Sequence, residues 1–196
     1  YPTENLVTAN ELHIPVGQPV SIELRSGDVI HSFWIPQLVG KVDMVPGHNN
    51  HLWFTPYETG EYWGQCAEYC GTSHANMRFR VIVETQEVYD AWVANQIQEA
   101  QPAVSAEAQA GEKIATTVCA ACHMIRGTTA AGVLGPDLTH VGSRSHIAAV
   151  TMENNAENLS KWIKNPPEVK PGSLMPALAL SDEQISQVVA YLQELQ

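Results

Sequence analysis

The sequence predicts two unlike domains, an all-β sandwich or small barrel followed by an all-α domain. Two observations support this division. Residues 11–85 contain short runs that alternate apolar and polar side chains, separated by turns with Pro and Gly. Beyond residue 86 the apolar spacing becomes helical, and no repeat of fixed period relates the two halves. A chain of 196 residues is long enough for two domains of about 100 residues each.

The first domain is expected over residues 1–98. Within it, residues 20–25 and 77–81 place an apolar side chain at every second position, as a strand with one buried face does. Short strands separated by regular turns favour a sandwich or small barrel. A further strand around residues 61–63 would leave the cysteine-containing stretch 64–77 as a loop between two strands.

The second domain is expected over residues 109–196, joined to the first by a linker. Apolar residues at helical spacing predict a helix over 88–97. Residues 99–108 are rich in Ala, Gln, Glu and Pro and lack large apolar side chains, which is typical of a flexible linker. Further helices are expected over 111–121, over 157–165, and after the capping box Ser181-Asp-Glu-Gln184.

Composition and charge exclude several classes of function. The chain has 21 acidic and 10 basic residues and a net charge of −11, whereas nucleic-acid binding needs clustered Lys and Arg. The longest run without Asp, Glu, Lys or Arg is residues 44–57, which is too short for a membrane span of roughly 20 apolar residues. We therefore expect neither a nucleic-acid partner nor a membrane span within these residues.

One pair of cysteines lies in the stretch Cys119-Ala-Ala-Cys122-His123. C-x-x-C-H is the attachment pattern of c-type haem, in which two thiols form thioethers and the adjacent imidazole binds the iron. The alternative is a redox C-x-x-C pair followed by His by chance, but the βαβ pattern of thioredoxins is missing. Pro136 lies where small cytochromes c place a proline whose carbonyl accepts a hydrogen bond from this histidine.

The sixth ligand of such an iron should be a Met or His far along the chain. Met124 is adjacent to His123 and cannot reach the other face of the haem, which leaves Met152 and Met175. Met175 lies in a turn-rich loop between two expected helices, so we predict it as the axial ligand. His/Met ligation leaves no open position, which suits electron transfer rather than oxygen chemistry.

The other pair of cysteines lies in a cluster with His31, His74 and Met77, and three interpretations compete for it. Cys66 and Cys70 could form a disulfide, or the two cysteines and two histidines could bind zinc. Neither interpretation uses the methionine. Thiolate, thioether and imidazole together favour copper, and two thiolates can bridge two copper ions with one histidine on each.

Three stretches, residues 29–36, 41–47 and 60–77, resemble subunit II of haem-copper cytochrome c oxidases, and the resemblance runs from about residue 10 to 98. It implies a cupredoxin-like fold with a binuclear copper A centre. It also implies a role for each candidate ligand: Cys66 and Cys70 bridge both copper ions, His31 and Met77 complete one, and His74 and the backbone carbonyl of Glu68 complete the other. The carboxylate of Glu68 is further implied to help hold a magnesium ion shared with subunit I.

The second half resembles the class I cytochrome c domain that is fused to subunit II in bacterial caa-type oxidases, on residues 162–167 and 170–176. The resemblance implies that Pro136 and Trp162 support the haem. It implies an oxidoreductase subunit that passes electrons from an external donor, such as a small cytochrome c or another periplasmic redox protein, through haem c and copper A to subunit I. There oxygen would be reduced to water with proton pumping.

The family has two transmembrane helices before the β-domain, so we expect these residues to be a truncated ectodomain from the extracytoplasmic, periplasmic face of the cell membrane. The alternatives are a copper A-containing denitrification subunit of the nitric oxide reductase type and a periplasmic copper-binding assembly protein with a cytochrome c domain. Eight histidines are too few for nitrous oxide reductase, and copper chaperones bind a single exchangeable copper. The other histidines are expected on the surface or as caps: His13, His48, His51, His140 and His146.

Overall fold

A computed structural model describes all 196 residues, which divide into two compact units. One unit comprises residues 10–94, and the other comprises residues 1–9 together with residues 95–196. Each unit has its own hydrophobic core, one built from strands and one mainly from helices. The all-β and all-α classes are thereby confirmed, while the domain boundaries at residues 98 and 109 stay predictions.

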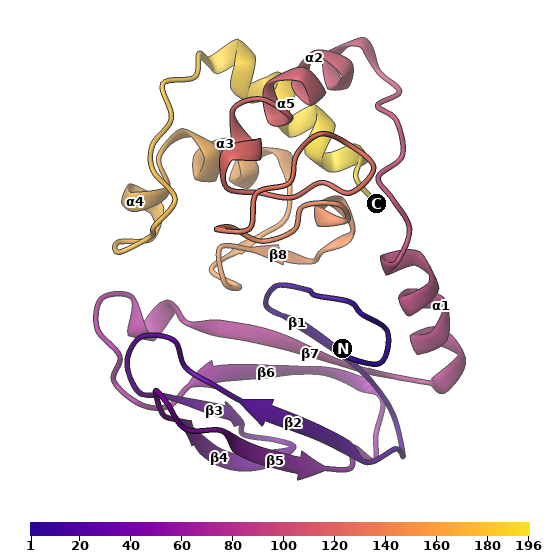
Figure 1. Cartoon of the computed structure of the whole chain (residues 1–196), viewed down its shortest axis with the longest axis vertical. Coiled ribbons are helices and arrows are strands. Elements are labelled where there is room, and N and C mark those ends of the chain that lie inside the picture. Colours follow the sequence, from indigo (N-terminus) through magenta and orange to yellow (C-terminus); the bar gives the residue numbers. More distant parts are fainter. The chain divides into compact units, whose positions relative to one another are not determined.

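The unit of residues 10–94 is built from a five-stranded sheet and a two-stranded sheet (Figure 1). The strand order in the larger sheet is β1-β7-β6-β3-β4, with β1 parallel to β7 and the other pairs antiparallel. β2 and β5 form the smaller antiparallel sheet. The strands are β1 (Glu11–Pro15), β2 (Val20–Leu24), β3 (His31–Ile35), β4 (Val39–Met44), β5 (Asn50–Phe54), β6 (Gly60–Cys66) and β7 (Arg78–Glu84).

Apolar side chains from both sheets form the core of this unit, because alternation along each strand sends every second side chain inward. The expected strands at residues 20–25, 61–63 and 77–81 correspond to β2, β6 and β7. Fully burying a side chain of this size contributes roughly 1.5–3 kcal/mol. The buried members of the core are Ile14, Leu24, Ile35, Leu52, Phe54, Val81 and Val83.

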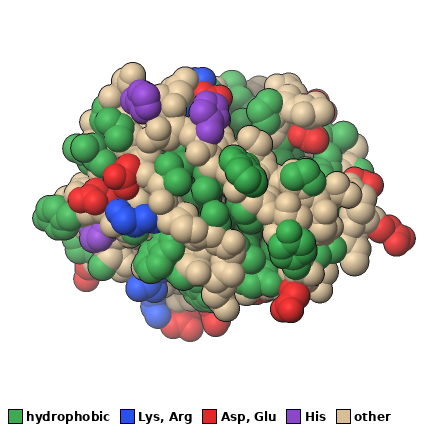
Figure 2. All heavy atoms as spheres, turned by 90° about the horizontal axis from the view of Figure 1, so that it is seen from below, with side chains coloured by type: hydrophobic (Ala, Val, Ile, Leu, Met, Phe, Trp, Pro, Cys, Tyr) green, Lys and Arg blue, Asp and Glu red, His purple; other side chains and the backbone are tan.

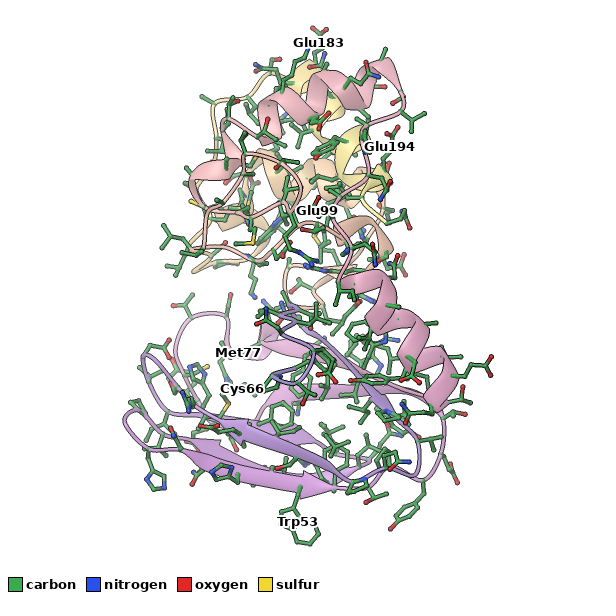
Figure 3. All side chains as sticks on the ribbon, turned by 45° about the vertical axis from the view of Figure 1, so that its right-hand side comes forward. Trp53, Cys66, Met77, Glu99, Glu183 and Glu194 are labelled. Carbon is green, nitrogen blue, oxygen red and sulfur yellow. The ribbon has the colours of Figure 1, made fainter.

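The outward face of β2 and β5 is mixed in character. Trp53 of β5 points away from the core and is 79% exposed (Figure 3). Its cross-strand neighbour is Ser21, and the next outward pair is Glu23 and His51. On this face apolar side chains are interspersed with polar and charged ones (Figure 2).

The helical unit is held together mainly by α2 (Ala106–Ala115) and α5 (Asp182–Glu194), which pack against each other. They approach closely at Gly111, where an added Cβ would lie 1.9 Å from the carbonyl oxygen of Gln187. The capping box predicted before the last helix is present, with Ser181 and Gln184 each bonding the other's backbone. The other elements are α3 (Ala156–Lys164), α4 (Pro166–Val169), the short strands β8 (His146–Ile147) and β9 (Met152–Glu153), and the 3₁₀ turns η2 (Cys119–Ala121) and η3 (Val141–Ser143).

Two expectations for the start of this unit need correction. The helix predicted over 111–121 is α2, which begins at Ala106 and ends at Ala115. Ser105 caps its first turn by accepting a bond from the amide of Ala108, so the last three residues of the predicted linker are helical. The composition of residues 99–108 suggested a flexible coil, because composition alone does not reveal that Ser105 caps a helix.

The segment between α1 (Gln86–Gln96) and α2 is also hydrogen-bonded to the helical unit. The amide of Ala100 donates to the carbonyl of Arg126 at 3.0 Å. His140, expected on the surface or as a cap, is 4% exposed, and its two ring nitrogens lie 3.1 Å from the carbonyl of Gln98 and 2.7 Å from that of Gln196. The surface assignment of His140 was therefore wrong, because the side chain ties two distant stretches of backbone together.

No helix of the chain is both long enough and apolar enough to cross a membrane.

Candidate copper and haem sites

The candidate copper ligands lie at the ends of three neighbouring strands. His31 is the first residue of β3, Cys66 is the last residue of β6, and Met77 immediately precedes β7. The loop between Cys66 and Met77 is closed at its base, because the amide of Cys66 donates to the carbonyl of Met77 at 2.9 Å. The amide of Ala67 also donates to the carbonyl of Ser32, so the strand carrying His31 is fastened to the same loop.

The sulfur and nitrogen atoms of this loop and of His31 form two similar pairs. The Cys66 and Cys70 sulfurs are 3.8 Å apart. Nδ1 of His31 lies 3.8 Å from the Cys66 sulfur, and Nδ1 of His74 lies 3.5 Å from the Cys70 sulfur. Figure 3 shows Cys66 and Met77 on the same side of the β-domain. Each pair therefore offers one sulfur and one imidazole nitrogen to a metal ion.

Two weaker donors complete the set. Sδ of Met77 lies 3.9 Å from the Cys70 sulfur, and the carbonyl oxygen of Glu68 lies 3.2 Å from the Cys66 sulfur. All six predicted copper-site residues are thus brought to one loop and its neighbouring strand. The Glu68 carboxylate lies 4.0 Å from Nζ of Lys41, so a basic side chain is close to the predicted magnesium ligand.

The two thiols differ in acidity. Burial alone would raise the pKa of Cys66, but hydrogen bonds from the backbone of Ser32 and Glu68, together with His31, outweigh it and lower the pKa to about 7. For Cys70, burial and the neighbouring Cys66 both raise the pKa. Cys66 is therefore the more acidic of the two thiols, and the thiolate is the form of cysteine that binds metals.

His31 has a second partner on its other ring nitrogen. Nε2 lies 2.9 Å from Oδ1 of Asp28, and this hydrogen bond is the largest cause that lowers the pKa of Asp28 to about 2. Burial alone would lower the pKa of His31, but its bonds to Asp28 and Cys66 raise it. Asp28 was not among the residues predicted from the sequence, although it lies three residues before a candidate ligand.

The C-x-x-C-H stretch forms a tight turn that starts at η2. The amides of Cys122 and His123 both donate to the carbonyl of Cys119, at 3.0 and 2.9 Å. Nδ1 of His123 donates to the carbonyl of Pro136 at 2.7 Å, as the sequence predicted for this proline. Because that bond occupies Nδ1, Nε2 is left as the nitrogen that can bind a metal.

The residues around His123 fit a large apolar group. An added Cβ at Gly135 would lie 2.5 Å from Cε1 of His123, so the chain passes the ring closely on one side. Val133, Leu134 and Leu174 project from the loops that carry Pro136 and Met175, and each is at least 80% exposed. A haem site needs an oriented imidazole and apolar side chains to cover the ring, and His123 and these two loops offer both.

The two methionine candidates lie in different surroundings. Met152 is in β9 and packs against the core of the helical unit, as does Trp162 of α3. Met175 is in the loop between α4 and α5 and is half-buried, with its amide 3.3 Å from Oγ of Ser173. The loop position leaves the Met175 thioether available, whereas Met152 is used in packing.

The fold and these two sites define a class of protein, an electron-transport protein with a cupredoxin-like copper domain followed by a cytochrome c domain. Residues 3–86 match the family model of the cytochrome c oxidase subunit II periplasmic domain, and residues 108–196 match the cytochrome c family. The chain therefore combines a cytochrome c oxidase subunit II periplasmic domain with a cytochrome c domain.

The matches to curated relatives cover the whole chain. Cytochrome c oxidase subunit 2 of Alkalihalophilus pseudofirmus is 41% identical over 100% of this chain and 57% of its own length. The subunit 2 of Bacillus sp. strain PS3 is 36% identical over 100% of this chain and 58% of its own length. This chain therefore spans a little over half the length of these relatives.

Among solved structures, the periplasmic domain of cytochrome oxidase subunit II from Bradyrhizobium japonicum is 35% identical. That match covers 45% of this chain and 64% of the solved chain, with a TM-score of 0.43.

Proposed function

We propose that the chain is the electron-entry part of a terminal respiratory oxidase, with a haem c in its helical domain and a binuclear copper A centre in its β-domain. Electrons would pass from an external donor through both cofactors to subunit I, where oxygen is reduced to water and protons are pumped. The bound haem and copper pair would supply the one-electron exchange. The protein would supply the rigid surroundings that keep ligand geometry nearly constant.

The arrangement of two sulfurs flanked by two imidazoles carries this proposal. The residues whose ligand atoms all lie within 4.8 Å of one another are His31, Cys66 and Cys70, and His74 joins this group through Cys70. A single zinc ion would need all four atoms around one centre. Two sulfurs 3.8 Å apart, each with its own histidine, instead suit two ions that share both sulfurs.

Ligand roles follow the same division. His31 and Met77 would hold one copper ion, His74 and the Glu68 carbonyl would hold the other, and Cys66 and Cys70 would bind both. Cys119 and Cys122 would attach the haem through thioethers, and His123 and Met175 would bind its iron. The Nδ1–H of His123, held by the carbonyl of Pro136, fixes the ring orientation and makes the imidazole a better donor.

The partners and the location of this electron path follow from the family. The matched model is a periplasmic domain, which implies an extracytoplasmic location. We propose that the complete protein is anchored in the cell membrane and docks on subunit I. The donor would be a small cytochrome c or another periplasmic redox protein, and Glu68 would help bind magnesium where the two subunits meet.

Metal analysis combined with EPR of the purified, haem-loaded chain tests the proposal. We expect two copper ions and one iron per chain, and an EPR signal from one unpaired electron shared equally by both copper ions. Cys66→Ser should abolish that signal, because a hydroxyl stays protonated and bridges poorly. A stoichiometry of one copper per chain, or of zinc in place of copper, would contradict the binuclear assignment.

A further inference from the structure

We infer that Asp28 is a positioning residue for the copper site, and that its carboxylate fixes the tautomer of His31 and tunes the electron density on that ligand. The inference rests on the proposed function in one respect, since it takes His31 to be a metal ligand. It adds a residue from outside the loop between Cys66 and Met77.

The contact geometry assigns the two nitrogens of His31 different roles. Nε2 lies 2.9 Å from Oδ1 of Asp28, while Nδ1 lies 3.8 Å from the sulfur of Cys66. A carboxylate is only an acceptor, so Nε2 must carry the hydrogen of this bond. Nδ1 is then the unprotonated nitrogen, and it faces the sulfur atoms. The carboxylate therefore selects the tautomer that can bind a metal on the correct side.

Asp28 is itself held by the preceding turn. Oγ of Ser26 lies 3.1 Å from Oδ1 of Asp28, and the amide of Asp28 lies 3.4 Å from the same hydroxyl oxygen. Ser26 forms a backbone bridge with Pro46, which anchors the turn to the chain after β4. Ser26, Asp28 and His31 thus form a chain of contacts in which each member orients the next.

Asp28 can orient the imidazole of His31 although its own side chain is exposed to solvent. The side chain of His31 is 13% exposed, whereas that of Asp28 is 72% exposed, so the carboxylate lies on the solvent side of a nearly covered imidazole. Histidine ligands commonly donate their other N–H to a carboxylate, and loss of such a partner typically costs about 10–100-fold in metal affinity or activity. The negative charge also favours the oxidised, more positive state of the metal centre.

Two substitutions of Asp28 separate the effect of its hydrogen bond to His31 from the effect of its negative charge. Asp28→Asn keeps an acceptor for Nε2–H but removes the charge, and Asp28→Ala removes both. Asp43→Asn is the matched control, because Asp43 pairs with Ser32, the residue after His31, and has no hydrogen bond to a ligand. Its side chain is also partly exposed, at 47%, so all three variants lose one negative charge at the same end of the sheet.

Each variant, purified as the haem-loaded chain, is compared with the wild type in three measurements. Competition with a copper chelator should show about 10–100-fold weaker copper retention for Asp28→Ala and a smaller loss for Asp28→Asn. The reduction potential of the copper site should rise in both Asp28 variants. Pulsed EPR should show a changed signal from the remote nitrogen of His31. Asp43→Asn should retain copper as the wild type does and leave the nitrogen signal unchanged.

Circular dichroism and thermal unfolding of each variant check that the fold is intact, which we expect for an exposed loop residue. If both Asp28 variants match Asp43→Asn in retention and in the nitrogen signal, the inference is overturned. The number of copper ions bound by the wild type tests the proposed function separately. The comparison of variants applies to one bound metal ion as well as to two, because it concerns His31 alone.

Discussion

At the scale of single residues, the proposed copper ligands divide into strong and weak donors. Met77 is 37% exposed, and its sulfur is a thioether that carries no charge and lies 3.9 Å from the Cys70 sulfur. Two thiolates and two imidazoles remain if it is removed. Met77 is therefore expected to adjust the electronic properties of the site rather than to hold the metal in it.

Met77→Leu should accordingly keep both copper ions while changing the visible spectrum and the reduction potential of the centre. Metal analysis and spectroelectrochemistry measure the two effects. Met44→Leu is the control, because Met44 packs against the core of the same domain and a Met-to-Leu exchange there typically costs less than about 1.5 kcal/mol. Complete loss of copper from Met77→Leu alone would show that the thioether is a main ligand.

The candidate ligands could be predicted where motif spacing identifies them. Cys66 to Met77 and Cys119 to His123 are close in sequence, so residue type and spacing were enough to group them. Asp28 is different, because its place three residues before His31 permits a contact between the two side chains but does not establish one. Its contact with His31 exists only once Ser26 orients the turn, and that orientation is a property of the folded chain.

At the scale of elements, the closest approach of two helices depends on one glycine. Gly111 of α2 has no side chain, which lets the backbone of α5 lie against it. Gly111→Ala would place Cβ 1.9 Å from a backbone oxygen that cannot rotate away. The helices would have to separate, although alanine is the better helix former.

Gly111→Ala should therefore destabilise the helical domain by about 1–3 kcal/mol, the usual cost of overpacking a core. Urea unfolding followed by the absorbance of the bound haem measures this loss. Gly40→Ala is the control, since no atom lies within 4 Å of a Cβ added at Gly40. Equal midpoints for the two variants would mean that α2 and α5 adapt to the extra methyl group.

The hydrogen bonds at the C-terminal end of α5 are expected to depend on pH. Both carboxylate oxygens of Glu194 accept backbone hydrogen bonds, at 2.7 Å from the amide of Val104 and 3.3 Å from that of Ser105. The bond from Val104 is the main cause that lowers the pKa of Glu194 from 4.5. A lowered pKa in the folded state stabilises the fold above the unfolded pKa, and that contribution is lost as the pH falls below 4.5.

An NMR titration of the Val104 amide measures this contact directly. In the wild type its chemical shift should change as the pH falls below 4.5, and in Glu194→Gln that change should disappear. Glu183→Gln, at the opposite end of the same helix (Figure 3), should leave the titration of the Val104 amide as in the wild type. An unchanged titration in Glu194→Gln would mean that another group controls this amide.

At the scale of the whole molecule, the chain has two cores that share no residue. Their membership follows the change in apolar spacing near residue 86, which is why the two fold classes could be predicted from the sequence. The structure of the linker could not be predicted in this way, because it depends on hydrogen bonds of single groups, such as the amide of Ala100 and the buried ring of His140. Composition reports polarity but not which backbone groups find partners.

Two separate cores and two separate cofactors predict that each domain is stabilised by its own ligand. A ligand at 100 times its Kd stabilises the folded state by about 2.7 kcal/mol, and 1 kcal/mol shifts the Tm of a domain of this size by about 4–8 °C. Calorimetry of the loaded chain should show two transitions, one that coincides with loss of the copper spectrum and one with loss of the haem spectrum.

Removal of copper with a chelator should then lower the copper-domain transition by about 10 °C or more and leave the haem-domain transition in place. Gly111→Ala should do the reverse, lowering only the transition reported by the haem. The two perturbations act on different cores, so their effects should add when they are combined. A single transition that moves as one in response to both changes would show that the two domains unfold as one cooperative unit.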